Sequence, residues 1–423
     1  MTLIQIVHKA PSNNTTGRLP HSLILLLASG AGLAVASLYY SQPALGLMAA
    51  AFHINDRLIG LIPTVTQLGY AAGVFFLSPL GDRIDRRRII LVKSAALVLA
   101  LALTACASSY GFLLVANVFV GLSATLAQDF VPAAAALAPA HRRGSIVGTV
   151  MTGLLLGILL SRVVSGAVAE WLGWRTVYGL AALTVVGILF AAWRLLPHFP
   201  VHSQLGYPAL LASMRHLWAH HIVVRRSTLA QAALSVAFSA FWSSLALMLQ
   251  HTYHLGSSIA GAFGMAGAAG SLAAPLAGRL ADHKGPRAVA ASGITIATLS
   301  FASMLALPVI PSAAQIVLLA VAAIGFDFGV QATLVAHQTI VYGADHTARS
   351  RLNALLFAGI FLGMAAGSSL SGVVLSRWGW TGISILAVIF SLFALAISTW
   401  SPRCHRSRQA SASLPTLLQP RRS

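Results

Sequence analysis

Residues 78–88 read Ser78-Pro-Leu-Gly-Asp82-Arg83-Ile-Asp85-Arg86-Arg87-Arg88, a short charged segment that separates two long apolar runs. A second segment, Gly278-Arg-Leu-Ala-Asp282-His-Lys284-Gly285-Pro-Arg287, repeats the pattern, with Asp282 standing 200 residues beyond Asp82. In this repeat Gly278 takes the place of Ser78, and Gly285 takes the place of Asp85. The two copies predict a chain built from two related halves.

The composition around these segments is strongly apolar. Of the 423 residues, 57% are hydrophobic and only 8% are charged, whereas soluble domains carry about 25% charged residues. The apolar residues form runs of the ~20 residues that a helix needs to cross a bilayer. The pattern predicts an all-α membrane protein with twelve transmembrane helices. The expected spans are residues 22–48, 58–79, 89–107, 111–137, 146–169, 174–196, 227–250, 257–278, 288–308, 313–340, 351–374 and 380–400.

The distribution of the 27 lysine and arginine residues predicts the orientation of these helices. Most of them lie in the terminal segments and in the loops on one side, whereas the opposite loops hold Arg57, Arg175 and Arg377. Because cytoplasmic loops are rich in lysine and arginine, both termini are expected in the cytoplasm. The same asymmetry accounts for the net charge of +19, so no nucleic-acid partner is expected.

The spans and charges together divide the chain into five expected regions. A short amphipathic helix is expected within the linker, near Leu210 to Trp218. The arginines of the tail are expected to lie near anionic lipid headgroups, and a regulatory tail is the alternative. The regions are a cytoplasmic N-terminal segment (1–21), an N-terminal six-helix half (22–196), a cytoplasmic linker (197–226), a C-terminal six-helix half (227–400) and a basic cytoplasmic tail (401–423).

A second set of repeated residues supports two parallel halves. Gly157 and Gly363 are 206 residues apart, and Gly166 and Gly372 share that offset. The pairs Gly173-Trp174 and Gly379-Trp380 follow at the same distance. Glycines spaced in this way permit close approach between membrane helices. Two parallel six-helix repeats are typical of secondary transporters that rock around a central site.

These motifs together resemble the major facilitator superfamily over about residues 22–400. The doubled charged loop is the specific signal, and Tyr40-Ser-Gln42-Pro43, Gln67-Leu-Gly69-Tyr70 and Arg349-Ser-Arg-Leu-Asn353 are similar to a bacterial drug, sugar or nucleoside efflux branch. The resemblance implies a monomeric, proton-driven exporter of small molecules in the bacterial cytoplasmic (inner) membrane. The alternatives are a proton-linked or facilitative importer and a non-transporting membrane sensor or scaffold.

The charged loops predict a conformational latch. Free N–H groups and the helix dipole attract an anion to a helix N-terminus, by roughly 0.3–1 kcal/mol at exposed sites. Asp82 is therefore expected to bind the start of the span at 351–374, and Asp282 the start of the span at 146–169. The alternative is that both are solvated loop charges. The family usually has glycine at the position of Asp85, so the first turn is expected to differ in shape. The expected latch residues are Asp82, Arg83, Arg86, Arg87, Asp282, Gly285, Arg287, Arg142, Arg143, Arg349 and Arg351.

Three charged residues lie well inside predicted spans, away from the ends, where each costs about 2.5–3.5 kcal/mol to insert. A rise of ~1.5 Å per residue places Arg162 and Asp327 at one depth, roughly 25 and 27 Å from the cytoplasmic loops, and Asp129 at about 12 Å. Asp327 is the candidate for the titrating carboxylate, with Arg162 as its partner, and a permanent ion pair is the alternative. Asp129 is expected to line the cavity, to meet Arg142, or to remain hydrated. The family's antiporters usually have an arginine where Asn117 stands, which leaves open that Arg162 has taken over that role or that proton coupling is absent.

A central substrate cavity is expected between the first, fourth, seventh and tenth spans. Polar and aromatic side chains there suit a small amphipathic solute, although helix packing is the alternative role for each of them. We expect neither a cofactor nor a metal site, and no motif of an enzyme occurs in the sequence. The candidate cavity residues are Tyr39, Tyr40, Gln42, Gln67, Tyr70, Asn117, Gln128, Trp242, Gln331 and Gln338.

Overall fold

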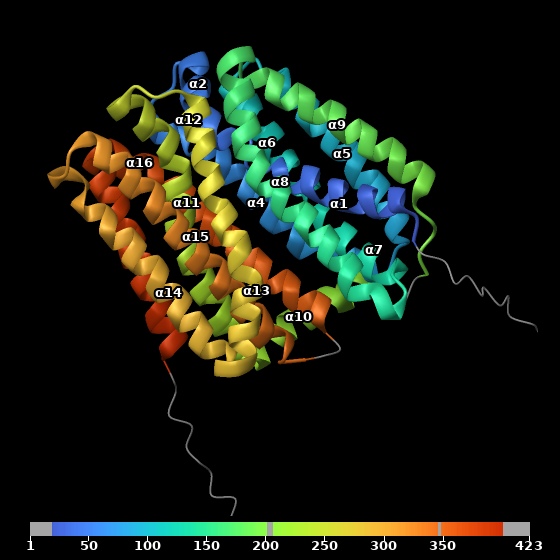
Figure 1. Cartoon of the computed structure of the whole chain (residues 1–423). Helices are drawn as coiled ribbons and strands as arrows, with labels where there is room; N and C mark the ends of the chain where they lie inside the picture. Colours follow the sequence, from blue (N-terminus) through green and yellow to red (C-terminus); the bar gives the residue numbers. More distant parts are fainter. Residues whose placement is uncertain (1–18, 201–205, 346–347, 401–423) are drawn as a thin grey trace, which may run out of the picture.

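The computed structural model describes residues 19–200, 206–345 and 348–400. Within these ranges the side chains at 56, 82, 140, 268–275 and 282 lie outside the described part. The described chain is almost entirely helical, and Figure 1 shows the helices as one bundle with α2 and α12 at one end and α10 at the other. We call the end that carries α10 the linker end and the opposite end the far end.

The N-terminal half contains six segments of spanning length, several of them composed of two helices. Its first span is broken between α1 and α2 by a turn at Ser37–Tyr40, and its fourth between α6 and α7 at Thr125 and Leu126. The elements are α1 (His21–Ala36), α2 (Ser41–Phe52), α3 (Asp56–Ile59), α4 (Leu61–Leu77), η1 (Ser78–Asp82), α5 (Arg86–Ala105), α6 (Tyr110–Ala124), α7 (Ala127–Leu137), η2 (Ala140–Arg142), α8 (Arg143–Leu172) and α9 (Trp174–Leu195).

The C-terminal half follows α10, which is the short helix predicted in the linker. Two predicted spans, 351–374 and 380–400, are united in α16, where Gly379 interrupts the helical dihedrals with φ of 58°. The predicted span 257–278 is divided between α12, η3 and α13. The elements are α10 (Tyr207–His220), α11 (Ile222–Tyr253), α12 (Ser257–Ala262), η3 (Phe263–Ala266), α13 (Gly267–Lys284), α14 (Pro286–Ser303), η4 (Met304–Val309), α15 (Ser312–Tyr342) and α16 (Arg349–Thr399).

Within the described part of the chain, ten helical segments are long and apolar enough to cross a membrane. The number falls below twelve because α16 contains two spans and because the span at 257–278 is broken into shorter helices. The fold class predicted from the sequence, an all-α membrane protein with two six-helix halves, is confirmed.

The two repeated loops differ in backbone conformation, as the exchange of glycine for aspartate predicted. Gly285 has φ of 83°, a region that side chains other than glycine rarely adopt. Asp85 instead has φ of −50° and ψ of 118°, and its carboxylate accepts a hydrogen bond from the Arg87 backbone N–H at 2.9 Å. Aspartate at this position therefore caps the N-terminus of α5 and needs no left-handed conformation.

The halves pack tightly at the far end. A Cβ atom on Gly166 of α8 would lie 2.4 Å from the Ser257 backbone oxygen at the start of α12, and one on Gly60 would lie 2.5 Å from the Ser368 oxygen of α16. Only glycine permits such backbone approach, so the predicted role of the glycine repeat is confirmed at Gly166. Toward the linker end, α13 has little contact with α8, and a cavity separates the halves there.

Candidate functional site

Arg162 of α8 is the centre of a buried cluster that joins the halves. Its side chain is only 2% exposed, and its Nε donates a hydrogen bond to Gln42 Oε1 of α2 at 2.9 Å. The guanidinium carbon lies 4.6 Å from the centre of the Tyr39 ring and 4.3 Å from that of the Trp242 ring of α11. Such cation–π contacts favour a desolvated cation by about 2 kcal/mol. Arg162 is thus held largely by neutral groups.

Asp327 of α15 approaches the same guanidinium without forming an ion pair. Asp327 is 4% exposed, and it takes no part in the ion pair between Lys93 and Asp129 or in that between His198 and Asp85. Gly267 at the start of α13 stands beside both groups: a Cβ atom there would lie 3.0 Å from Asp327 Oδ2 and 4.0 Å from Arg162 Nη1. Arg162 and Asp327, which the sequence analysis paired, are therefore brought together, but a space separates their side chains.

The space between them is a hollow of about 30 Å³, lined also by Gln331 and Phe238. A cavity needs roughly 10–15 Å³ to hold one water molecule, so the hollow has room for water but not for an organic solute. Arg162 Nη2 is buried and has no hydrogen-bond partner among the described residues. Water or a small polar group in the hollow would satisfy this donor.

A larger cavity of about 360 Å³ opens between the halves at the linker end. Its volume is at the lower limit of ordinary ligand pockets, which measure about 300–1,000 Å³. Both halves contribute polar side chains to it, namely Ser78, Arg86, Gln128, Asp129, Gln338, Tyr342, Arg349, Ser350 and Asn353. This cavity is the larger of the two spaces between the halves.

Asp129 has a partner that the sequence analysis did not identify. Lys93 Nζ of α5 lies 2.7 Å from Asp129 Oδ2 of α7, and both side chains are buried. The expectation of a hydrated side chain or of pairing with Arg142 was wrong, because Arg142 is exposed while Lys93 reaches Asp129 from the neighbouring helix. A lysine inside a predicted span was the signal that could have revealed the pair.

The expected latch is only partly described. The side chains of Asp82 and Asp282 lie outside the described residues, so the two anions of the latch stay predictions. η1 does contact α16, and Arg86 and Arg349 both line the linker-end cavity. Several other members have different surroundings from those expected. Arg87 donates a hydrogen bond to the Trp193 backbone oxygen, and Arg351 donates one to Ser213 of α10. Arg287 lines a cavity inside the C-terminal half. The remaining arginines are exposed, namely Arg83, Arg142 and Arg143.

Eight of the ten candidate cavity residues fall into three groups. Tyr39, Gln42, Trp242 and Gln331 surround Arg162 or the hollow, and Gln128 and Gln338 line the linker-end cavity. Gln67 and Tyr70 of α4 lie between the halves, where Gln67 Oε1 accepts from Ser368 at 2.9 Å and the Tyr70 ring packs on Phe361.

Two candidates lie away from the cavity between the halves. The amide of Asn117 bonds to Thr66 and to the Leu113 backbone oxygen, which places it in the packing of α4 against α6. Tyr40 packs against Tyr178 and lines an apolar groove between α1 and α8. Asn117 and Tyr40 therefore contribute to helix packing, which was the alternative role given for each candidate.

Two contacts at the far end were missed in the sequence. Glu170 of α8 accepts a hydrogen bond from the Ser258 backbone N–H at 2.6 Å, and Arg57 of α3 donates to Ser376 of α16 at 3.3 Å. Ser376 is 206 residues beyond Glu170, the offset of the repeated glycines. We call the contact of α8 with α12 and the contact of α3 with α16 the two seams between the halves. The two hydrogen bonds occupy related places in these seams, and the repeat offset was the signal that could have found them.

Comparison with known proteins agrees with this architecture. A family model of the Major Facilitator Superfamily matches residues 27–348. The uncharacterized transporter YgaY of Escherichia coli O157:H7 is 35% identical over 390 residues, covering 92% of this chain and 97% of that protein. A probable transporter of Streptomyces coelicolor is 33% identical over 373 residues, covering 86% and 83%.

Solved structures share the fold. A bacterial homologue of the human lysosomal transporter Spinster, in an inward-facing and unoccupied conformation, has a TM-score of 0.73 at 18% identity and covers 91% of this chain and 100% of that one. With two halves of six helices, a cavity between them and a family match over most of the chain, this protein is a multi-pass membrane transporter. It belongs to the major facilitator superfamily.

Proposed function

We propose that this transporter exports small organic molecules across the bacterial cytoplasmic membrane in exchange for protons. The observation that carries the proposal is the placement of Arg162 and Asp327, two buried charges from different halves, on one hollow without an ion pair. Each charge costs about 2.5–3.5 kcal/mol to place in a membrane. A pair kept apart at that cost is suited to changing its state during transport.

Protonation of Asp327 supplies the coupling step. The ionised carboxylate attracts Arg162 across the hollow and so favours approach of α15 to α8. A proton on Asp327 removes this attraction, while Gln42, Tyr39 and Trp242 continue to hold the guanidinium. Proton binding therefore changes the relative free energies of two arrangements of the halves, which is what a ligand must do to shift their populations.

The linker end is assigned to the cytoplasm, because most lysines and arginines lie in the segments at that end. Solute enters the 360 Å³ cavity from the cytoplasm while the far-end contacts of Glu170 and Arg57 are closed. Export then requires closure around Arg86 and Arg349 at the linker end and opening of the far end. Asp82 and Asp282 are proposed to stabilise that closed linker end.

The test uses purified protein in proteoliposomes that enclose a pH-sensitive dye. Candidate solutes are first chosen from sugars, nucleosides and amphipathic drugs by their ability to raise the apparent unfolding temperature, since a ligand of the folded state stabilises it. For such a solute, an imposed proton gradient is expected to drive solute and protons in opposite directions. Asp327→Asn is expected to uncouple the two movements, whereas Asp85→Asn, a carboxylate change outside the site, keeps them coupled.

The outcomes separate the competing functions. Undiminished proton-coupled transport by Asp327→Asn would exclude the proposed role of this carboxylate. Movement of solute and protons in the same direction would identify an importer, and failure of every binding solute to move would favour a sensor or scaffold. Binding of the solute at a fixed pH checks that the Asp327→Asn variant is folded.

A further inference from the structure

A second cavity, of about 340 Å³, lies inside the C-terminal half at the linker end. It is bounded by the beginnings of α11 and α14 and by the ends of α15 and α16. No lining residue is shared with the cavity between the halves. The cavity therefore lies outside the transport route described above, at the level where the helices leave the membrane.

Two arginines give this cavity its charge. Arg226 of α11 donates from Nη2 to two backbone oxygens near the end of α16, that of Ile397 at 3.0 Å and that of Ser398 at 3.5 Å. Arg287, the second residue of α14, reaches the cavity from another side and makes no hydrogen bond within the described part of the chain. Among the residues whose side chains the structure describes, no carboxylate lines the cavity. Two cations thus face one space whose described wall contains no acidic side chain.

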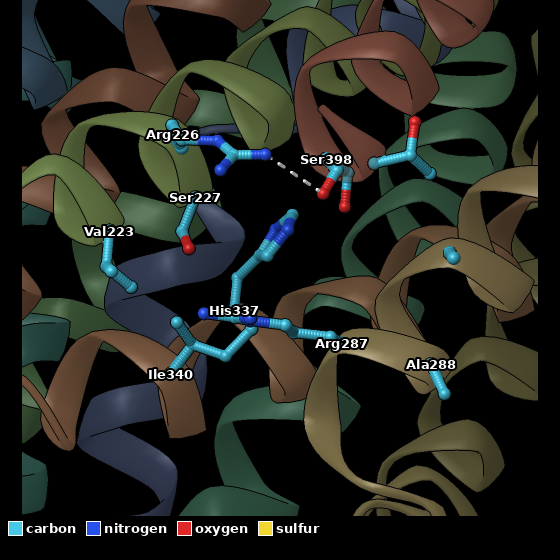
Figure 2. A pocket seen from close by; sticks show the side chains of 10 residues that line it. Val223, Arg226, Ser227, Arg287, Ala288, His337, Ile340 and Ser398 are labelled. Carbon is cyan, nitrogen blue, oxygen red and sulfur yellow. Dashed lines mark hydrogen bonds between the residues drawn. The ribbon is translucent and has the colours of Figure 1, made fainter. Parts of the chain in front are cut away.

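Buried polar side chains face the same space. His337 of α15 is 2% exposed, and its Nδ1 lies 2.9 Å from Gln231 Oε1. Figure 2 shows the His337 ring projecting between the side chains of Arg226 and Arg287. Ser227 is 6% exposed and also lines the cavity. Its hydroxyl can donate a hydrogen bond to a ligand in this space.

The linker and the C-terminal tail, which adjoin the beginning of α11 and the end of α16, contain no acidic side chain. The residues after Trp400 include five arginines and neither aspartate nor glutamate, and residues 197–226 also lack acidic side chains. By composition these two segments supply no counter-charge, and an anion from another molecule can supply it.

We propose that this cavity binds a phosphate-bearing anion at the cytoplasmic membrane surface. Arginine pairs with phosphate through charge-assisted, often bidentate hydrogen bonds, and the Ser227 hydroxyl adds a donor to the same space. Basic pockets between transmembrane helices at this level suit the headgroup of an anionic phospholipid. The phosphodiester of phosphatidylglycerol and free inorganic phosphate share the chemistry that these residues recognise.

The proposal is tested with the purified full-length protein in detergent. Phosphatidylglycerol and zwitterionic phosphatidylcholine are titrated separately, and bound lipid is counted by native mass spectrometry. Arg287→Gln is the main variant, because this side chain makes no hydrogen bond that folding would lose. Arg88→Gln is the control, since residue 88 is the repeat position of Ala288 and does not line the cavity.

Phosphatidylglycerol is expected to bind more tightly than phosphatidylcholine, and Arg287→Gln is expected to weaken its binding about tenfold, equivalent to 1.4 kcal/mol. Arg88→Gln should leave that affinity unchanged, and Ser227→Ala should lower it. Displacement of the lipid by millimolar inorganic phosphate would identify free phosphate as a ligand, and resistance to it would identify the lipid. Equal binding of both lipids, or an unchanged affinity in both cavity variants, would overturn the proposal.

Discussion

Lys93 and Asp129 form a buried ion pair that exists in only one half of the molecule. Their charged atoms are 2.7 Å apart between α5 and α7. The position 200 residues beyond Lys93 is Gly293, where a Cβ atom would lie 2.5 Å from Thr333 Oγ1. Close packing of glycine against threonine thus replaces the ion pair in the C-terminal half. The two halves share a fold but are held together internally by different interactions.

Removing one member of this pair is expected to destabilise the protein strongly. Asp129→Asn leaves the Lys93 ammonium buried without a counter-charge, which typically costs about 3–5 kcal/mol. The double variant Lys93→Met with Asp129→Leu should be less damaging, because no charge then remains buried. Apparent unfolding temperatures of the single and double variants measure the difference. A double variant that is less stable than Asp129→Asn would contradict this account.

Far-end closure is expected to fail in Gly261→Ala. A Cβ atom on Gly261 would lie 2.4 Å from the Arg162 backbone oxygen, so α12 could not approach α8. Gly179→Ala is the matched control, since its added Cβ meets nothing within 4 Å. Both changes raise helix propensity by about 1 kcal/mol, and only the first blocks the seam.

The measurement is the reactivity of a single cysteine at Ser165, which is fully buried in the closed seam, in a background without native cysteines. Reactivity toward a water-soluble maleimide should rise in Gly261→Ala and remain low in Gly179→Ala. A shift of 1–2 kcal/mol between open and closed forms corresponds to roughly a 5–30-fold change in their ratio. Equal reactivity in the two variants would show that the close approach does not control closure.

Glu170→Gln is expected to loosen the far end to a smaller degree. The carboxylate makes a charge-assisted hydrogen bond to the Ser258 N–H, and such bonds are about twice as strong as neutral ones. Arg57→Gln should have a similar effect in the other seam, where Arg57 contacts Ser376. Because the seams are separate, the two effects on Ser165→Cys reactivity should add as free energies. A double variant no more reactive than either single variant would argue against two independent contacts.

Asp85 is expected to contribute an acid-sensitive part of the stability at the linker end. Burial alone would raise its pKa, but hydrogen bonds from His198 and from the Phe199 and Arg87 backbones outweigh it and hold the pKa below its ordinary value of 3.8. A carboxylate whose pKa is lowered by folding stabilises the protein above its unfolded pKa, and this stabilisation is lost as pH falls through the folded pKa.

Asp85→Asn keeps a good helix cap, since asparagine and aspartate are similar in this role, but it cannot ionise. The wild-type protein should therefore unfold at a higher temperature than Asp85→Asn near neutral pH, and the difference should shrink as pH falls below about 4. Unfolding temperatures measured across this range check the sign. A difference that grows on acidification would contradict it.

Much of the architecture was predictable because crossing a membrane limits the choices. Apolar runs of spanning length, the doubled charged loop and the glycine offset of 206 identified the helices and the two halves. Charges inside spans are costly enough to mark Arg162 and Asp327 as special, and the count of residues along each helix placed them at one depth. These inferences depend on distance along the chain, which the sequence contains directly.

The rotation of each helix about its own axis was decided only by the tertiary structure. In a soluble protein a polar face marks the outside of a helix. In a membrane the lipid and the interior of the helix bundle are both apolar, so the sequence pattern of a spanning segment does not show which of its faces meets lipid and which meets other helices. Tyr39 and Tyr40 are adjacent, yet one faces Arg162 and the other faces Tyr178. The choice of Lys93 as the partner of Asp129 likewise depends on how α5 and α7 are turned toward each other. The sequence alone determined which helices form and where the buried charges lie along them, and packing between helices decided which side chains meet.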